Sequence, residues 1–404
     1  MKQALLWVCA LAVIASAAVP GGVSASSWGM WVECEGDNAT LSSRRKIVEM
    51  LDAAARYHYD TVFVQVYRHD RAWFKTDRCD SRPYQVFAAK EKTDLLRFVI
   101  DEAHKRGIAV HAWMNMLRIG KDKNAHIVKT LGPDVVTRDN KGRSMLSYPG
   151  LQLPGEENRY YEADGSGYWL EPGDPRVRSY LLAVVEDVLT QYPDIDGIHL
   201  DFIRMPYTVP FSPGSRFPKG ITYGYGKASV ERFVKQHGAD PLKPMAANDT
   251  MQQWDGWRRD QITELVRDVR KTIDRRGVPA KLSTAVVCWA DRAYLSAFQD
   301  WRRWLEERTV DFICLMNYSY DDRLARYITA TGMAFRGDRQ IYIGLGAYML
   351  ADRRPVLYRQ IDDCVKLKAD GIALFSYDTM AKDKTLFEGV SECRDRAPAA
   401  APAR

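Results

Sequence analysis

The sequence lacks the short motifs that mark several common enzyme classes. Among its 404 residues there is neither a G-x-G-x-x-G nor a G-x-x-x-x-G-K-[ST] phosphate loop, no G-x-S-x-G nucleophile elbow and no H-E-x-x-H zinc motif. Histidine is scarce, with seven residues, and neither a C-x-x-C pair nor a Cys/His cluster occurs. These absences disfavour a nucleotide-binding open sheet, a serine hydrolase and a zinc enzyme, so we expect neither a metal nor a cofactor.

Strong charge of one sign and long apolar runs are also absent. The net charge is only +6, and the 58 Lys and Arg residues are scattered among 52 Asp and Glu residues rather than gathered in a stripe, which argues against a nucleic-acid partner. No apolar run beyond the N-terminal region approaches the roughly 20 residues that a membrane-spanning helix needs. We therefore expect no integral membrane span once the N-terminal segment is removed.

Residues 1–25 have the features of a secretory signal peptide. Lys2 gives a positive start, Ala4–Ala18 an apolar core, and Val23-Ser24-Ala25 a small-residue cleavage site. A retained N-terminal anchor is the alternative. The mature protein is accordingly expected outside the cytoplasm, either in a periplasm or secreted.

Removal of this segment leaves an even number of cysteines in an oxidising compartment, where disulfides are common. The spacing alone does not fix their pairing. We favour Cys34 with Cys79 and Cys364 with Cys393, because Cys288 and Cys314 fall in apolar, strand-like runs where buried thiols are common.

Beyond residue 25, short β-rich runs alternate with longer amphipathic segments in eight rounds. This alternation predicts an α/β fold, a (β/α)₈ TIM barrel over residues 26–396, with a disordered tail at 397–404 and a doubly wound open sheet as the runner-up. The expected strands are Gly29–Cys34, Thr61–Arg68, Ile108–Leu117, Gly197–Ile203, Leu282–Trp289, Asp311–Tyr318, Gln340–Tyr348 and Gly371–Tyr377. The expected helices are Ser42–Tyr59, Asp94–Arg106, Asp174–Leu189, Val230–Gln236, Met251–Arg275, Ala293–Glu307, Asp322–Thr331 and Arg354–Leu367.

Two long connections interrupt this regularity, Arg118–Gly173 and Thr208–Ala247. Loops of such length in a compact domain commonly form a wall or lid over a functional site. The alternative is a decorative insertion with small strands of its own.

The fourth expected strand carries the residue that draws most attention. Side chains alternate along a strand, so His199 and Asp201 should face the barrel axis while Ile198, Leu200 and Phe202 face outward. Asp201 would then lie at the C-terminal mouth, where TIM barrels build their active sites. The structural alternative is an acid that caps the next helix or pairs with Arg204.

The other strand ends supply acids, amides and aromatic side chains to the same mouth. Paired carboxylates among aromatics are typical of glycoside hydrolysis, in which one acid protonates the leaving oxygen and the other attacks or activates water. Metal-assisted hydrolysis is less favoured, because the acids are not closely grouped. The residues expected there are Glu33, Glu35, Gln65, Arg68, Trp113, Asn115, Asp201, Arg204, Trp289, Asp291, Asn317, Tyr318, Tyr348 and Asp378.

Several motifs, in order along nearly the whole mature chain, resemble those of the glycosyl-hydrolase-like family ten. They are F-V-Q-V-Y-R-H-D-R-A-W-F (Phe63–Phe74), E-A-H-K-R-G-I-A-V-H-A-W-M-N (Glu102–Asn115), L-E-P-G-D-P-R-V-R-S-Y (Leu170–Tyr180), D-I-D-G-I-H-L-D-F-I-R-M-P (Asp194–Pro206) and I-Y-I-G-L-G-A-Y (Ile341–Tyr348). The resemblance implies a bacterial extracytoplasmic barrel, in a family whose known activity includes cutting peptidoglycan glycan strands. Many relatives carry a second acid where this chain has Phe202.

Two functional hypotheses follow, with a polysaccharide or glycan strand as the partner in both. In the first, a glycoside hydrolase acts on a β-linked, amino-sugar polysaccharide with Asp201 as nucleophile or general base and with Glu171 or Glu35, ahead of Asp291 and Asp378, as the acid. In the second, the barrel binds carbohydrate or serves as a cell-wall scaffold without catalysis, as the missing second acid suggests. The expected substrate-binding residues are Gln65, Arg68, Trp113, Asn115, Arg204, Trp289, Asp291, Asn317, Tyr318, Tyr348 and Asp378.

Overall fold

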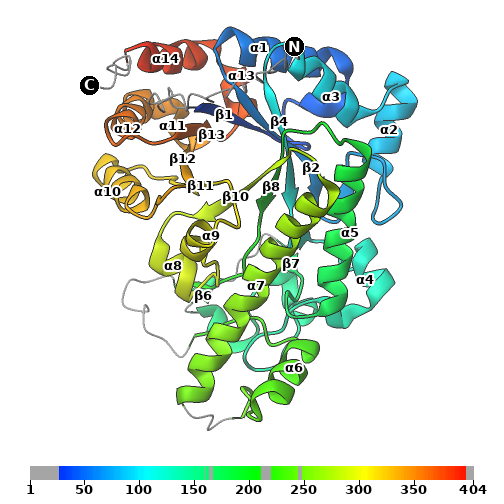
Figure 1. The fold of residues 1–404 in the computed structure, drawn as a ribbon. Coiled ribbons are helices and arrows are strands. Elements are labelled where there is room, and N and C mark those ends of the chain that lie inside the picture. The colour runs from blue at the N-terminus through cyan, green and yellow to red at the C-terminus, as the bar shows by residue number, and fades with distance from the viewer. Residues whose placement is uncertain (1–26, 160, 163–166, 211–219, 244–247, 397–404) are drawn as a thin grey trace, which may run out of the picture.

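The computed structural model describes residues 27–159, 161–162, 167–210, 220–243 and 248–396 (Figure 1). The predicted signal peptide and the predicted tail lie outside these residues. Within them, no helix is long and apolar enough to cross a membrane.

Eight parallel strands close into a barrel, as predicted (Figure 1). The barrel is closed because β1 pairs in parallel with both β2 and β13. Except for β2, the observed strands end before the predicted C-terminal limits, since the chain turns away there to form the mouth. The strands, in order around the barrel, are β1 (Ser27–Val32), β2 (Thr61–Arg68), β4 (Ala109–Asn115), β8 (Gly197–Asp201), β10 (Lys281–Val287), β11 (Phe312–Met316), β12 (Gln340–Leu345) and β13 (Gly371–Leu374).

Helices cover the outside of the barrel, and several begin where their capping residues predict. Ser43, Asp94 and Asp174 each accept a hydrogen bond from a backbone N–H in the first turn of the helix that follows. The outer helices are α1 (Arg44–Arg56), α2 (Arg82–Glu91), α3 (Leu95–His104), α5 (Pro175–Gln191), α7 (Asn248–Arg276), α10 (Asp322–Met333), α12 (Arg354–Lys366) and α14 (Lys384–Asp395), with the short α11 (Ala347–Leu350) and α13 (Tyr377–Lys382) near the mouth.

The single helix predicted at 293–307 is wrong, because the segment forms two helices, α8 (Ala290–Leu295) and α9 (Trp301–Glu306). Phe298 between them has φ of 53°, a left-handed conformation that no α-helix accommodates. The side chain of Gln299 then accepts a hydrogen bond from Val287 N–H at 2.8 Å and donates one to the Ile203 carbonyl at 3.2 Å. The break therefore ties this segment to the ends of β10 and β8.

The barrel interior is a compact layer of aromatic and small side chains. Trp31 Nε1–H donates to Nε2 of His199 at 3.2 Å, and the His199 ring lies 4.4 Å from that of Phe63 between centroids. Burial holds the pKa of His199 well below its ordinary value, so this ring is neutral. His199 is therefore part of the barrel core beneath the mouth.

The predicted outward direction of Phe202 is wrong, because strand alternation fails at the mouth, as it also does at the end of β2. A shift in register between Gln65 and Tyr67 turns Tyr67 outward, where its hydroxyl donates to Asp70 at 2.9 Å, and gives the inward position to Arg68. Strand β8 ends at Asp201, and the following Phe202 has φ of 48°. Phe202 consequently faces the mouth rather than the outer helices.

The two long connections pack together as a lobe beside the mouth, in the lower half of Figure 1. The lobe contains β5 (Arg118–Gly120), α4 (His126–Leu131), β6 (Tyr161–Glu162), β7 (Tyr168–Trp169), β9 (Val209–Pro210) and α6 (Lys227–His237). Strands β5 and β7 pair within the first connection, whereas β6 and β9 join the first connection to the second. A further two-residue strand, β3 (Arg71–Ala72), pairs antiparallel with the end of β2.

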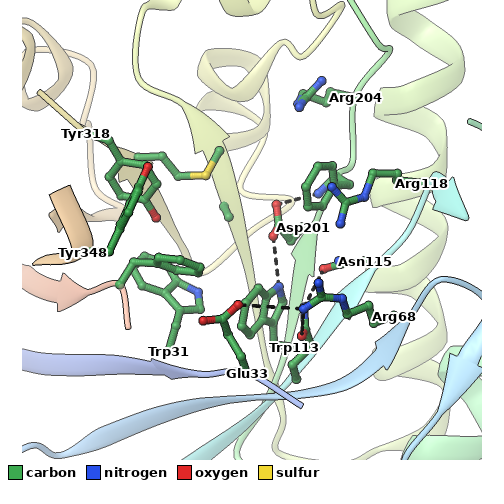
Figure 2. Close-up of a pocket in the computed structure, with 15 residues that line it drawn as sticks. Trp31, Glu33, Arg68, Trp113, Asn115, Arg118, Asp201, Arg204, Tyr318 and Tyr348 are labelled. Atoms are coloured by element: carbon green, nitrogen blue, oxygen red, sulfur yellow. Dashed lines mark hydrogen bonds and ion pairs between the residues drawn. The ribbon is translucent and has the colours of Figure 1, made fainter. Parts of the chain in front are cut away.

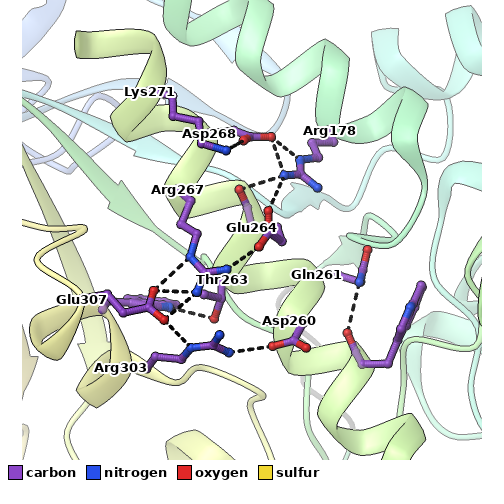
Figure 3. Close-up of polar contacts among 12 residues, drawn as sticks. Arg178, Asp260, Gln261, Thr263, Glu264, Arg267, Asp268, Lys271, Arg303 and Glu307 are labelled. Carbon is purple, nitrogen blue, oxygen red and sulfur yellow. Dashed lines mark hydrogen bonds and ion pairs between the residues drawn. The ribbon is translucent and has the colours of Figure 1, made fainter.

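The long helix α7 connects this lobe to the barrel, and ion pairs fix its barrel half (Figure 3). Arg178 of α5 donates to Asp268 at 2.6 Å, Arg267 pairs with Glu307 at 2.6 Å, and Arg303 of α9 reaches Asp260 at 2.7 Å. Because these charges form a connected network across three helices, they hold the helices more firmly than isolated surface pairs would.

The two predicted disulfides are wrong, since all six cysteines of the barrel are free thiols. Instead of bonding to Cys79, the Cys34 thiol donates to Oε1 of Gln65 at 3.2 Å. The sulfur of Cys393, at the end of α14, accepts a hydrogen bond from Arg396 at 3.0 Å. All four cysteines of the two predicted pairs are buried.

Candidate active site

The C-terminal ends of the strands surround a pocket of about 310 Å³ (Figure 2). Nine residues expected at the mouth line it together, namely Glu33, Gln65, Arg68, Trp113, Asn115, Asp201, Arg204, Tyr318 and Tyr348. Six further lining residues are Trp31, Arg118, Phe202, Ala285, Met316 and Phe375.

Asp201 lies at the base of this pocket with both carboxylate oxygens engaged. Oδ2 accepts a hydrogen bond from Trp113 Nε1–H at 3.0 Å, and Oδ1 accepts one from the Phe202 backbone N–H at 2.6 Å. Burial raises the pKa of Asp201, and these two hydrogen bonds, with the nearby Arg118 and Arg204, act in the opposite direction. The carboxyl is thus held in a fixed orientation in a largely dry site.

Glu33, just beyond the end of β1, is the second carboxyl in the pocket. Its Oε2 accepts a hydrogen bond from Ser376 Oγ–H at 2.9 Å, and its Oε1 lies 3.8 Å from Nη1 of Arg68. Burial raises the pKa of Glu33, and the negative charge of Asp378 adds to this effect. A carboxyl in such surroundings can retain a proton at higher pH than an exposed glutamate.

The two sides of the pocket differ in chemistry, and the two carboxyls lie between them (Figure 2). One side is an aromatic wall, formed by Trp31, Phe375, Tyr318 and Tyr348. The Phe375 ring lies 6.1 Å from that of Trp31 and 5.7 Å from that of Tyr348 between centroids. These neighbouring rings offer apolar surface against which a sugar ring can pack.

The opposite side carries three arginines, Arg68, Arg118 and Arg204. The Arg118 guanidinium stacks 3.9 Å from the centre of the Phe202 ring and donates to Nε2 of His69 at 3.2 Å. Burial and the neighbouring arginines lower the pKa of His69 to about 4, so the imidazole is a neutral acceptor at ordinary pH. Phe202 therefore serves as a stacking surface for Arg118.

Glu171, a predicted acid catalyst, lies outside the pocket and is fully buried in the lobe. Its Oε2 accepts hydrogen bonds from Thr137 Oγ1 and Gly226 N–H, both at 2.8 Å, and its Oε1 accepts one from Ser229 Oγ at 2.7 Å. The carboxyl thus joins the two connections of the lobe to each other, and burial raises its pKa.

Glu35, the other predicted acid catalyst, lies at the rim rather than among the lining residues. Its Oε1 pairs with Nη1 of Arg71 at 2.5 Å, and its Oε2 lies 3.5 Å from Nε of Arg68. Asp378 is also outside the pocket lining, and its Oδ1 accepts a hydrogen bond from the Asn38 backbone N–H at 2.6 Å.

Three predicted binding residues have other contacts and do not line the pocket. Asn317 points to the outer helices, where its Nδ2 donates to the Ala325 carbonyl at 2.8 Å and to Thr329 Oγ1 at 3.0 Å. Trp289 precedes α8 and packs on the main core, and the exposed Asp291 accepts a hydrogen bond from Arg292 N–H at 2.9 Å.

Glu33 was expected at the mouth, but it was not among the acids predicted to be catalytic. Gly29 faces the barrel interior, since a Cβ there would lie 2.8 Å from the Phe63 ring. The alternation of β1 then turns Trp31 and Glu33 to the same side as Gly29 and makes Glu33 the acid of the pocket. The inward Phe375 and Met316, by contrast, carried no distinctive pattern.

The described residues hold no group of three or more His, Cys, Asp or Glu side chains arranged to bind a metal ion. The chemistry available to this pocket from its own side chains is therefore that of two carboxyls, three guanidinium groups, two amides and an aromatic wall.

Comparison with known proteins gives one family match and several structural matches. Residues 28–334 match the family described as Glycosyl hydrolase-like 10. The glycosyl hydrolase DigH of Escherichia coli strain K12 is 27% identical over 379 residues, covering 85% of this chain and 77% of that protein. The glycosyl hydrolase YngK of Bacillus subtilis is 24% identical over 294 residues, covering 68% of this chain and 49% of its own length.

Two solved structures with the same barrel fold match over most of this chain. The catalytic domain of β-amylase from Paenibacillus polymyxa matches with a TM-score of 0.58 at 10% identity, covering 92% of this chain and 99% of that chain. The endo-β-1,4-mannanase from Thermotoga petrophila matches with a TM-score of 0.53 at 10% identity, covering 94% of this chain and 78% of that chain. At this level of identity, the matches establish the TIM-barrel fold alone.

Proposed function

The chain belongs to the glycosyl hydrolase-like 10 family, and from this premise we propose that it is a glycoside hydrolase that cleaves O-glycosyl bonds with Asp201 and Glu33. The observation that carries the proposal is that two carboxyls, the buried Asp201 of β8 and the partly buried Glu33 at the end of β1, share one pocket with an aromatic wall. Two carboxyls in different environments are what glycosidic cleavage requires.

The surroundings of the two carboxyls support different roles. Burial raises the pKa of Asp201, but hydrogen bonds to both of its oxygens and two nearby guanidinium groups act against this rise and stabilise the ionised form that a nucleophile or general base needs. Glu33 is placed to donate its proton to the leaving oxygen, since burial and Asp378 favour its protonated form. Glu33 thereby replaces Glu171 and Glu35 as the proposed acid.

The proposed substrate is a β-linked, amino-sugar polysaccharide of the bacterial cell wall, with peptidoglycan glycan strands as the leading candidate. The motifs shared with the family support this substrate, and the aromatic wall provides stacking surface for sugar rings. Gln65, Asn115 and Arg68 would bind hydroxyl or N-acetyl groups. With the signal-like residues 1–25, the proposal includes an extracytoplasmic location.

The direct test is to incubate the purified mature protein with glycan strands stripped of their peptides, and with plant and fungal polysaccharides. Cleavage is expected as new reducing ends and as released oligosaccharides in mass spectra, absent with the Asp201→Asn variant. Binding of the strands without new reducing ends would instead favour the non-catalytic carbohydrate-binding or scaffold barrel.

A further inference from the structure

Tyrosine side chains continue from the aromatic wall to the outer surface on the β11–β12 side of the mouth. Tyr348, which lines the pocket, is 52% exposed, and its ring lies 5.9 Å from that of the pocket residue Tyr318 between centroids. Tyr320 follows Tyr318 by two residues and is 55% exposed. Its ring is contacted by Arg353, which belongs to the turn directly after α11, the helix that carries Tyr348.

The loop that carries Tyr320 is anchored beneath the ring. The buried Gln360 of α12 donates a hydrogen bond of 2.9 Å to the Ser319 carbonyl, and Asp321 N–H donates to Ser319 Oγ at 3.1 Å. Asp321 also caps α10 by accepting a hydrogen bond from Leu324 N–H at 2.9 Å. The Tyr320 backbone is thus fixed on both sides before any ligand arrives, which reduces the entropy lost on binding.

The ring of Tyr320 is itself positioned by a cation. The Arg353 guanidinium lies 5.2 Å from the ring centre, within the range of a cation–π contact. Because about half of the Tyr320 surface remains in water, its side chain contributes little to the free energy of folding. What it presents is a flat apolar face, a hydroxyl and a neighbouring guanidinium with spare N–H donors.

We propose that Tyr320, beyond the pocket residue Tyr348, forms a further sugar-binding subsite at the outer edge of the pocket, which stacks on units of the glycan chain beyond those held at Asp201 and so selects long chains over short fragments. The proposal rests on the proposed function. A saccharide is the occupant because Tyr348 is continuous with the aromatic wall of the proposed active site through Tyr318 and Phe375, and Tyr320 follows Tyr318 on the same loop. Pyranose rings have an apolar C–H face and a polar edge, which match a tyrosine ring bordered by an arginine.

The test measures binding of two probes to proteins that also carry Asp201→Asn, so that the probes are not consumed. The probes are a disaccharide and an octasaccharide fraction prepared from peptide-free glycan strands, titrated in a calorimeter. Tyr320→Ala should weaken octasaccharide binding about tenfold, which corresponds to removal of roughly 50 Å² of apolar contact, and should leave disaccharide binding unchanged. Tyr320→Phe, which keeps the ring, should bind both probes as tightly as the parent.

Tyr327→Ala is the matched control. Tyr327 is 61% exposed but lies on α10, the helix that leads from the mouth toward the opposite end of the barrel. This variant should bind both probes like the parent, and both alanine variants should keep the parental melting temperature because each side chain is exposed.

The possible results separate the inference from the proposed function. Octasaccharide affinity that is unchanged in Tyr320→Ala would overturn the subsite and leave the proposed function intact, and equal losses for both probes would overturn it as well. A loss of affinity in Tyr320→Phe as large as in Tyr320→Ala would show that the hydroxyl, rather than stacking, holds the chain. If neither probe binds the parent, the proposed substrate and the subsite both fail.

Discussion

The indole N–H of Trp113 donates a 3.0 Å hydrogen bond to Oδ2 of Asp201. The two residues come from β4 and β8, which are adjacent strands, and Trp113 pairs in register with His199, two residues before Asp201. The bond fixes the carboxylate at the pocket base and partly offsets the rise in pKa that burial imposes. Through this contact the barrel core orients the carboxylate that is the proposed nucleophile or general base.

Replacement of Asp201 by Asn should reduce glycan cleavage by roughly 10²–10⁴-fold, because the neutral amide neither attacks the sugar nor activates water. The thermal midpoint should shift by no more than about 2–4 °C, since the amide fits the same space. Asp196→Asn is the control at the opposite end of β8, where Asp196 accepts hydrogen bonds from Val110 N–H and His104, both at 2.8 Å. It should lower the midpoint and retain turnover. Full activity in Asp201→Asn contradicts the assignment.

The Trp113→Phe variant should move the acid limb of the pH–rate profile to higher pH. The hydrogen bond from Trp113 lowers the pKa of Asp201, so its removal raises that pKa and a higher pH is needed to ionise the carboxyl. The profile of kcat/KM against pH measures the effect. In Trp31→Phe the acid limb should stay in place, because Trp31 donates to the neutral His199. If the acid limb does not shift in Trp113→Phe, the ionisation of Asp201 does not control the acid side of the kcat/KM profile.

Glu33→Gln should lower kcat on natural polysaccharide by about 10²–10⁴-fold and remove the alkaline limb of the profile, because no proton donor remains. Aryl glycosides with good leaving groups should lose much less, since their departure needs little proton donation. Glu35→Gln should keep most of the activity, because it removes only ion pairs at the rim, each worth about 0–1 kcal/mol. A large loss of activity in Glu35→Gln with little loss in Glu33→Gln would identify Glu35 as the acid, which was one of the two candidates predicted from the sequence.

Glu171→Gln should make the free energy of unfolding less dependent on pH while it preserves turnover. Burial raises the pKa of Glu171 above its ordinary value of 4.5, so the folded state binds this proton more tightly than the unfolded chain does. The resulting stabilisation is fully present below about pH 4.5 and declines as the pH rises through the folded-state pKa. Denaturant unfolding across this range measures the slope. Lost turnover with an unchanged slope would restore Glu171 as the catalytic acid.

Local patterns predicted much of this molecule. Period-two alternation and helix caps located all eight strands and six of the outer helices but missed α2 and α14, and the position of Asp201 at a strand end was enough to place it at the mouth. The failures occur where one residue adopts a conformation that no pattern encodes. Phe298 breaks the predicted helix and Phe202 turns into the pocket, each with a positive φ that a non-glycine residue adopts only in a supporting tertiary environment.

The sequence by itself determined the barrel and its family, because both depend on periodicity and on motifs contained in short stretches. The tertiary structure decided which acid stands opposite Asp201. Glu33, Glu35 and Glu171 are alike as residues, and they differ only in contacts with segments remote in the chain: Ser376 for Glu33, Arg71 for Glu35 and Ser229 for Glu171. Burial and remote partners set the direction of a carboxyl and its proton affinity, and only the closed barrel with its lobe brings those partners together.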